Sequence, residues 1–437
     1  MQMRSRRVVV LAVLLGVLLM TSGARLAGAE GGYEVWAIDQ SDTTPTGGGT
    51  LYVYDGASLA GQAAAAARPE VIDLGGSAEA FCLARTGTVP RRPHMLLFDD
   101  GGTHAILSYV LTGHVAFLDA GSKEPVGCVD VGVQAHAAFP SPDESYVVVA
   151  NQNGKLLQRI TTDYATNTFT LDTAATLDLA SCTTPNGAPC EDATLRPDNA
   201  PICPVVDSTS TFTLVTLRGG GLFVVDSSAT PMAIVAEYDR VAVHPNGCGG
   251  VQTGGKMYIT SGGGTGANPL ESDLYAFPMA GFSRTPAPPN TPAPAVVFSR
   301  DTENAGFVDT HGALLTKHER YLWVGDRAAN TIVVVDTATD EVVDVIQLAG
   351  TVSQDPAPDL MALSPAGNRA FIAFRGPNPL TANVPGVNNA VGGTPGVGIV
   401  RVERGGGSGT LQALAPLSHV VGGVERADQH AIAVRQR

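Results

Sequence analysis

Apolar residues along this chain fall in short runs separated by polar turns, and the runs recur in groups of four. The clearest group spans His311–Gly350, where a first apolar run is followed by YLWVG (321–325), TIVVVD (331–336) and EVVDVIQL (341–348). Each run has four to eight residues rich in Val, Ile, Leu and aromatics, bounded by Gly, Asp, Asn or Thr, which predicts antiparallel strands joined by tight turns. Four such strands, repeated every ~40–50 residues, are typical of the blades of a β-propeller.

The same pattern recurs along the rest of the chain. Five more copies are expected at His94–Val131, His136–Leu179, Ile202–Glu237, Val241–Phe298 and Asp359–Leu414. In the copy that begins at Val241, the first strand is predicted at Val241–His244. The chain ends supply one further blade, because Tyr33–Leu74 has the second, third and fourth strands only, whereas Gln429–Arg437 is a first strand with nothing after it. We therefore predict an all-β fold, a seven-bladed β-propeller closed by pairing of the C-terminal strand with the N-terminal blade, which leaves no open sheet edge at the seam.

Three of these segments resemble the repeat of the YVTN-type seven-bladed β-propeller family, in which a second strand like Tyr-Val-Thr-Asn precedes a Val-rich third strand ending in Asp. They are YVVVANQNGKLLQRI (146–160), YLWVGDRAANTIVVVDTATDEVVDVIQLAG (321–350) and, loosely, TLVTLRGGGLFVVDSS (213–228). The turns in SPDESYVVVA (141–150) and SPAGNRAFIA (364–373) are similar to the family's Ser-Pro-Asp-Gly turn, with Gly replaced in the first. The resemblance covers most of the chain and implies the fold. It does not imply one function, because this architecture serves lactonases, copper and electron-transfer enzymes and plain binding proteins.

The first 29 residues are expected to be a signal peptide rather than part of the fold. Basic residues precede an apolar run at Val8–Met20, and the small residues at 27–29 fit a signal-peptidase site. The run is short for a membrane span, so we predict cleavage near Ala29, one propeller domain over residues 30–437, and a periplasmic or secreted protein. Ser-Arg-Arg-Val-Val at 5–9 also resembles a twin-arginine export signal, and both export routes stay open.

The net charge limits the classes of partner that this chain can bind, and the cysteines indicate the cellular compartment. The net charge of −14 becomes −18 when the four arginines of the leader are removed, and such a chain lacks the basic footprint that nucleic acid requires. All six cysteines follow the leader, an even count that predicts disulfides in an oxidising compartment. About fifteen pairings are possible, and we predict the three that join neighbours along the chain, Cys82–Cys128, Cys182–Cys190 and Cys203–Cys248.

Histidines and carboxylates recur where first strands begin, and these strands line the central channel of a propeller. The histidines are His94, His136, His311 and His430, and the carboxylates at or just before the same point are Asp309, Asp359 and Asp428. Imidazoles from separate rigid strands can hold copper, zinc or iron, with carboxylates as further ligands or as acceptors for the second ring nitrogen. We predict a transition-metal site at the channel mouth, with copper favoured. The alternative is that each histidine only bonds the backbone of the neighbouring blade.

Arginines recur in the loops between second and third strands, on the same face as the channel mouth. They are Arg218, Arg327 and Arg375. Two long insertions, Cys182–Ala200 and Arg375–Gly396, are expected to form loops on this same face. Converging guanidinium groups could clamp a carboxylate or a phosphate of a ligand, beside Asp309, Asp359 and Asp428. The alternative, which we favour, is that the arginines pair with these aspartates.

The predicted function is that of an exported binding protein that holds a transition metal at the channel mouth. One alternative is a lactonase-like hydrolase, in which a metal or an Arg/His pair polarises a ring ester for attack by water. Another is a cell-surface module whose loops dock a protein or a polysaccharide. We expect a monomer with no transmembrane segment once the leader is removed, and we assign no catalytic residue.

Overall fold

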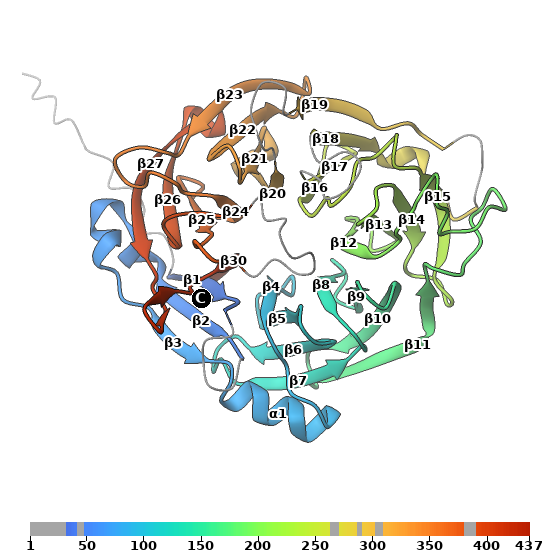
Figure 1. Ribbon diagram of the computed structural model, residues 1–437, viewed down its shortest axis with the longest axis horizontal. Helices are drawn as coiled ribbons and strands as arrows, with labels where there is room; N and C mark the ends of the chain where they lie inside the picture. Colours follow the sequence, from blue (N-terminus) through green and yellow to red (C-terminus); the bar gives the residue numbers. More distant parts are fainter. Residues whose placement is uncertain (1–31, 42–47, 263–270, 286–290, 302–308, 380–389) are drawn as a thin grey trace, which may run out of the picture.

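Seven four-stranded antiparallel sheets stand around a central axis in the computed structural model (Figure 1). The structure describes residues 32–41, 48–262, 271–285, 291–301, 309–379 and 390–437. The predicted fold class is confirmed, since the sheets form a closed seven-bladed β-propeller. The predicted signal peptide lies outside the described residues.

Each blade runs outward from the axis along the chain, except at the seam, where its innermost strand is the last of the chain. Blade 1 contains β30 (Gln429–Gln436), β1 (Tyr33–Asp39), β2 (Thr50–Asp55) and β3 (Glu70–Asp73). Blade 2 contains β4 (Pro93–Phe98), β5 (His104–Tyr109), β6 (His114–Asp119) and β7 (Pro125–Asp130). Blade 3 contains β8 (Ala135–Pro140), β9 (Tyr146–Asn151), β10 (Leu156–Asp163) and β11 (Thr168–Asp178). Blade 4 contains β12 (Pro201–Val206), β13 (Phe212–Leu217), β14 (Leu222–Asp226) and β15 (Ala233–Tyr238).

The remaining blades complete the ring. Blade 5 contains β16 (Gly250–Thr253), β17 (Lys256–Thr260), β18 (Glu271–Pro278) and β19 (Ala295–Asp301). Blade 6 contains β20 (Thr310–Leu315), β21 (Tyr321–Asp326), β22 (Thr331–Asp336) and β23 (Glu341–Gln347). Blade 7 contains β24 (Pro358–Leu363), β25 (Arg369–Phe374), β26 (Gly396–Glu403) and β27 (Ser408–Pro416). A small hairpin of β28 (Val420–Val421) and β29 (Val424–Glu425) precedes the closing strand.

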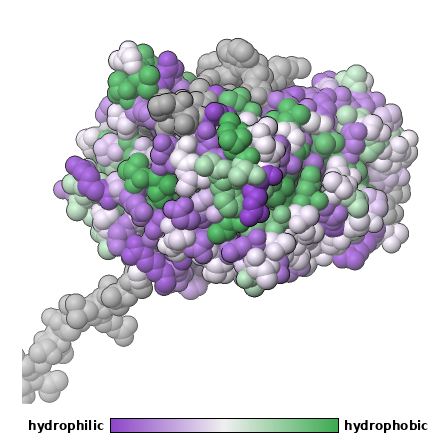
Figure 2. All heavy atoms as spheres, turned by 90° about the horizontal axis from the view of Figure 1, so that it is seen from below, coloured by the Kyte–Doolittle hydropathy of each residue, from purple (hydrophilic) through white to green (hydrophobic). Residues whose placement is uncertain are grey.

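The hydrophobic core lies between blades rather than inside one layer. Middle strands such as β5, β9 and β22 are buried along their whole length, whereas the outer strand β23 is largely exposed. Trp36 of blade 1 packs edge-on against Phe98 of blade 2, with ring centroids 5.2 Å apart. Seen from its edge, the ring shows hydrophilic side chains interspersed with apolar ones over its outer surface (Figure 2). Packing between blades therefore holds the innermost strands in fixed relative positions.

The ring closes as the sequence predicts, through pairing of the two ends of the chain. Strands β1 and β30 are antiparallel, with Val35 opposite Val434 and Ala37 opposite Ile432. Near the first residue of β1, Glu34 accepts hydrogen bonds from Arg435 at 3.2 Å and from Arg437 at 3.1 Å. The C-terminal strand therefore supplies the backbone partner that β1 would otherwise lack.

One predicted strand is wrong. The first strand of blade 5 is β16, Gly250–Thr253, and Val241–His244 lies in a turn instead. The Asp239 carboxylate accepts hydrogen bonds from the backbone amides of Val241 and Ala242, at 2.9 Å each. This local turn takes up the amides that a ladder would need, so the apolar run cannot pair, and Val241 is 81% exposed.

A helix that the strand pattern does not predict connects blades 1 and 2. It is α1, Ser77–Thr86, and its Cys82 forms a disulfide with Cys128 of β7. The other disulfides are Cys182–Cys190, within the loop after β11, and Cys203–Cys248, which joins β12 to the segment before β16. All three predicted pairings are confirmed, and such bonds persist in oxidising compartments. Over the described ranges, no helix has the length and apolar character needed to cross a bilayer.

Candidate functional site

The four predicted histidines hold equivalent positions in four blades. His94, His136, His311 and His430 are each the second residue of an innermost strand, in β4, β8, β20 and β30. Pairing with the next strand is irregular at each of these points, because Pro93 and Met95, for example, have partners while His94 falls in the register shift between them. Similar shifts occur at His136, His311 and His430. Bulges of this kind turn a side chain out of the regular alternation, which aims it at the axis.

The structure brings the four imidazole rings into one buried row. The ring centroids of His136 and His94 are 4.7 Å apart, and those of His94 and His430 are 3.7 Å apart in a stacked arrangement. The row ends at His311, whose centroid lies 5.3 Å from that of His430. All four side chains are at most 7% exposed.

Hydrogen bonds at Nδ1 determine which ring nitrogen of each histidine carries the proton. His136 Nδ1 lies 2.8 Å from Ile202 O, and His430 Nδ1 lies 2.9 Å from His94 O. A carbonyl oxygen can only accept, so Nδ1 donates in both rings, and Nε2 keeps its lone pair in the neutral form. These contacts run between blades, as the structural alternative predicts, yet they also present Nε2 as a ligand atom.

The same assignment holds for His94 through Gln40. Gln40 Nε2 donates to Asp428 Oδ2 at 2.7 Å, which directs its amide oxygen toward His94 Nδ1, also at 2.7 Å. His94 Nδ1 is therefore the donor, and its buried Nε2 has no hydrogen-bond partner among the described residues. A buried acceptor with no partner is costly and is a place where a ligand or an ion would be stabilised.

Burial keeps the rings of His94, His136 and His430 neutral at physiological pH. Burial lowers the pKa of His136 to about 4. Burial, followed by the neighbouring His430 and His136, holds the pKa of His94 well below its ordinary value, and burial does the same for the pKa of His430. Neutral imidazole is the form that binds metal ions.

The predicted carboxylates and two of the three predicted arginines form a largely buried chain of alternating charge beside the histidines. Arg327 contacts Asp309 through Nε and Nη2, at 2.7 and 3.0 Å, and reaches Asp359 through Nη1 at 3.4 Å. Arg375 donates to Asp359 through Nη1 at 2.6 Å and holds Asp428 through Nε and Nη2, at 2.7 and 3.0 Å. Three carboxylates against two guanidinium groups leave one negative charge on this chain.

Asp359 joins the charge chain to the histidine row. Its Oδ1 lies 2.8 Å from His311 Nδ1 and 3.7 Å from His430 Nε2. Burial raises the pKa of Asp359, but His430, His311, Arg327 and Arg375 outweigh it and hold this pKa well below its ordinary value. The ligand atoms of His311, Asp359 and His430 all lie within 4.8 Å of one another.

Arg218 does not join this chain. Its Nε donates to Asp198 Oδ2 at 2.5 Å, and its Nη1 donates to Asn153 Oδ1 at 3.0 Å. Asp198 belongs to the insertion Cys182–Ala200, so Arg218 anchors that loop. The other long insertion, Arg375–Gly396, is described except for residues 380–389.

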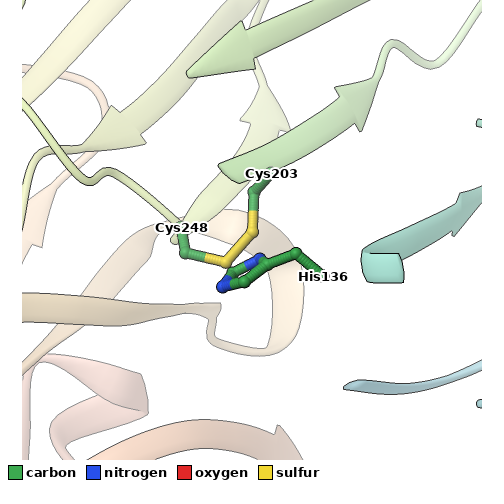
Figure 3. Close-up of side chains that lie close together, drawn as sticks. All are labelled: His136, Cys203 and Cys248. Carbon is green, nitrogen blue, oxygen red and sulfur yellow. A yellow bond between two sulfur atoms is a disulfide. The ribbon is translucent and has the colours of Figure 1, made fainter. Parts of the chain in front are cut away.

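Two features of the site are absent from the sequence-based prediction. One is Gln40, which follows the second strand of blade 1, in the loop position that Arg327 and Arg375 hold in blades 6 and 7. An alignment of those loops across all blades would have included it. The other is the packing of His136 against the Cys203–Cys248 disulfide, shown in Figure 3.

The neutral histidines should make the protein acid-sensitive. In the unfolded chain His136 gains a proton as the pH falls through about 6.5, but in the folded protein it does so only near pH 4. The unfolded state therefore binds more protons between these values, and the free energy of unfolding should fall by about 3 kcal/mol from this group as the pH drops from 7 to 4. Urea denaturation at several pH values measures this. His136→Asn, which retains a donor near Nδ1, should flatten the profile, and an unchanged slope would contradict the prediction.

Likeness to known proteins shows the fold and no family. No protein-family model matches the chain, and no curated protein matches it. A candidate 6-phosphogluconolactonase from Bacteroides fragilis has a similar structure, with 11% identity, a TM-score of 0.56 and coverage of 92% of this chain and 98% of that one. A second, from Bacteroides uniformis, has 12% identity, a TM-score of 0.55 and coverage of 92% and 99%. A β-propeller domain from Myceliophteria thermophila has 10% identity, a TM-score of 0.50 and coverage of 75% and 88%.

Proposed function

We propose that this protein is an exported binding protein that holds a transition-metal ion through His94, His136, His311 and His430. The observation that carries the proposal is the protonation pattern shared by three of the four rings. His94, His136 and His430 each donate from Nδ1 to an acceptor supplied by another segment of the propeller. Each imidazole therefore offers an Nε2 lone pair. The buried Nε2 of His94, which has no partner within the described part of the chain, fits a metal better than it fits a purely structural role.

The donor set supports a borderline or soft divalent ion. Imidazole suits copper, zinc, iron and nickel, and copper heads the general order of affinity for divalent ions, so copper is the first candidate. Asp359 adds a carboxylate beside His311 and His430. A divalent cation there would also be attracted by the single negative charge left on the Asp–Arg chain.

The arrangement supports binding over the lactonase-like alternative. A hydrolase of that kind would need carboxylates or arginines free to meet a substrate, whereas Asp309 and Asp428 each accept two hydrogen bonds from an arginine. The likeness to candidate lactonases rests on 11–12% identity, which carries the fold alone. The loop-docking alternative has no specific contact in its favour among the described residues.

The test is the metal content of the mature protein, purified without chelator or affinity tag. We expect near-stoichiometric copper or zinc, and His430→Ala should weaken binding by about tenfold or more, because a lost ligand costs at least as much as a lost outer hydrogen bond. His318→Ala, at an exposed position, serves as the matched control. Circular dichroism of each variant checks that the fold is retained. Unchanged metal binding in His94→Ala, His136→Ala, His311→Ala and His430→Ala would overturn the proposal.

A further inference from the structure

The Cys203–Cys248 disulfide is packed against one end of the histidine row. The two sulfur atoms and one ring nitrogen of His136 all lie within 4.8 Å of one another, and the three side chains converge from separate segments (Figure 3). Cys203 is 0% exposed, Cys248 is 4% exposed and His136 is 7% exposed. In the described part of the chain, neither of the other two disulfides belongs to such a group of potential ligands.

The backbone would keep the two cysteines close together without the covalent bond between them. Cys203 N donates to Thr216 Oγ1 at 3.1 Å, and the same hydroxyl donates to Gly247 O at 2.5 Å. On the other side of Cys248, Gly249 N donates to Thr260 Oγ1 at 2.9 Å. Both threonines belong to strands of the rigid core, so the Cα separation of 5.0 Å does not depend on the disulfide alone.

We propose that this disulfide is a redox gate on a second metal site, formed by Cys203, Cys248 and His136. An external dithiol reduces the bond by exchange: the protein disulfide gains two electrons and two protons and becomes two thiols, while the dithiol becomes a disulfide. A divalent ion then binds both sulfur atoms as thiolates, which releases the two protons, and binds the imidazole nitrogen of His136.

The ligand set specifies the class of metal. Two thiolates and one imidazole suit a soft or borderline ion such as zinc, in a site with three protein ligands and a fourth position for water or another ligand. His94, with its ring centroid 4.7 Å from that of His136, is the nearest protein side chain of the histidine row for that position. This site goes beyond the proposed function, because its two thiolate ligands exist only in the reduced protein and His136 is the one protein ligand of its core set that the oxidised site also uses.

The experiment compares oxidised and reduced protein with Co²⁺ as the probe. Folded protein is treated with dithiothreitol, freed of it under anaerobic conditions, assayed for thiols and titrated with Co²⁺. We expect near-ultraviolet thiolate-to-cobalt absorption at one equivalent in the reduced protein and none in the oxidised protein. The reduced Cys203→Ser/Cys248→Ser variant should lose the band. The reduced Cys182→Ser/Cys190→Ser variant, which lacks a different disulfide, should keep it.

Three results would overturn the proposal. The first is a Cys203–Cys248 bond that stays oxidised when native protein is treated under conditions that reduce Cys182–Cys190. The second is reduced protein without the band, and the third is a band that survives loss of both cysteines. His136→Asn retains both cysteines and therefore tests the site even if the double cysteine variant misfolds. On reduction it should form the thiols but bind Co²⁺ more weakly. Metal binding by the oxidised protein is read separately, so failure here leaves the test of the histidine site intact.

Discussion

Replacing Arg375 with methionine should lower the free energy of unfolding by about 3–5 kcal/mol. Arg375 is fully buried, and it is the only side chain among the described residues that contacts both Asp359 and Asp428 within the charge chain. Removal of the guanidinium group leaves the carboxylates of Asp359 and Asp428 buried without enough positive charge beside them. Their lost hydration is then no longer offset, and this makes the loss of one partner strongly destabilising. Methionine has a similar length and no charge, so packing changes little. Urea or thermal denaturation at pH 7 measures the change.

A surface arginine provides the matched comparison. Arg401 pairs with Glu403, and their side chains are 55% and 31% exposed, so Arg401→Met should lower the free energy of unfolding far less than Arg375→Met does. Arg375→Lys should fall between the two, because it restores the charge but cannot reproduce the contacts of a planar guanidinium with two carboxylates. Equal losses for Arg375→Met and Arg401→Met would show that the buried chain contributes no more than a surface pair.

Removing residues 429–437 should abolish the native fold rather than merely weaken it. Strand β30 pairs with β1 along its length and lies against the innermost strands of the neighbouring blades, so its loss exposes an entire strand edge and opens the ring. It also removes His430 from between His94 and His311. We expect insoluble or aggregated protein, and size-exclusion chromatography with near-ultraviolet circular dichroism measures this.

Deleting Arg437 alone is the control for that truncation. Arg437 contacts Glu34 and Asp55 from a position that is 46% exposed, and such pairs contribute about 1 kcal/mol or less. A synthetic peptide of residues 429–437, added during refolding, should recover part of the native protein if the missing strand is the cause. A soluble, monomeric truncation with an unchanged melting temperature would show that closure by this strand is dispensable.

The ring could be predicted because it is encoded in local patterns that repeat. Strand runs and turn residues recur blade after blade. The copy at Tyr33–Leu74 lacks a first strand, and the single leftover run Gln429–Arg437 supplies it. Neighbouring cysteines along the chain lie in neighbouring structural segments of a propeller, which is why the three pairings could be predicted. The prediction failed at Val241–His244, where an apolar run looks like a strand but the Asp239 carboxylate makes a turn.

The sequence by itself determined the propeller, its seam and the presence of four histidines at equivalent points of the inner strands, because the place of a residue within its repeat specifies its distance from the axis. Only the tertiary structure decided what those histidines can do. The acceptor that fixes the protonation of His136 comes from another blade, and so do the second aspartates of the two arginines, Asp359 for Arg327 and Asp428 for Arg375. Gln40 meets Asp428 across 388 residues of chain, and His136 meets the Cys203–Cys248 disulfide from another blade. Contacts of this kind exist only after separate blades have packed against one another, and no pattern local to one blade can encode them.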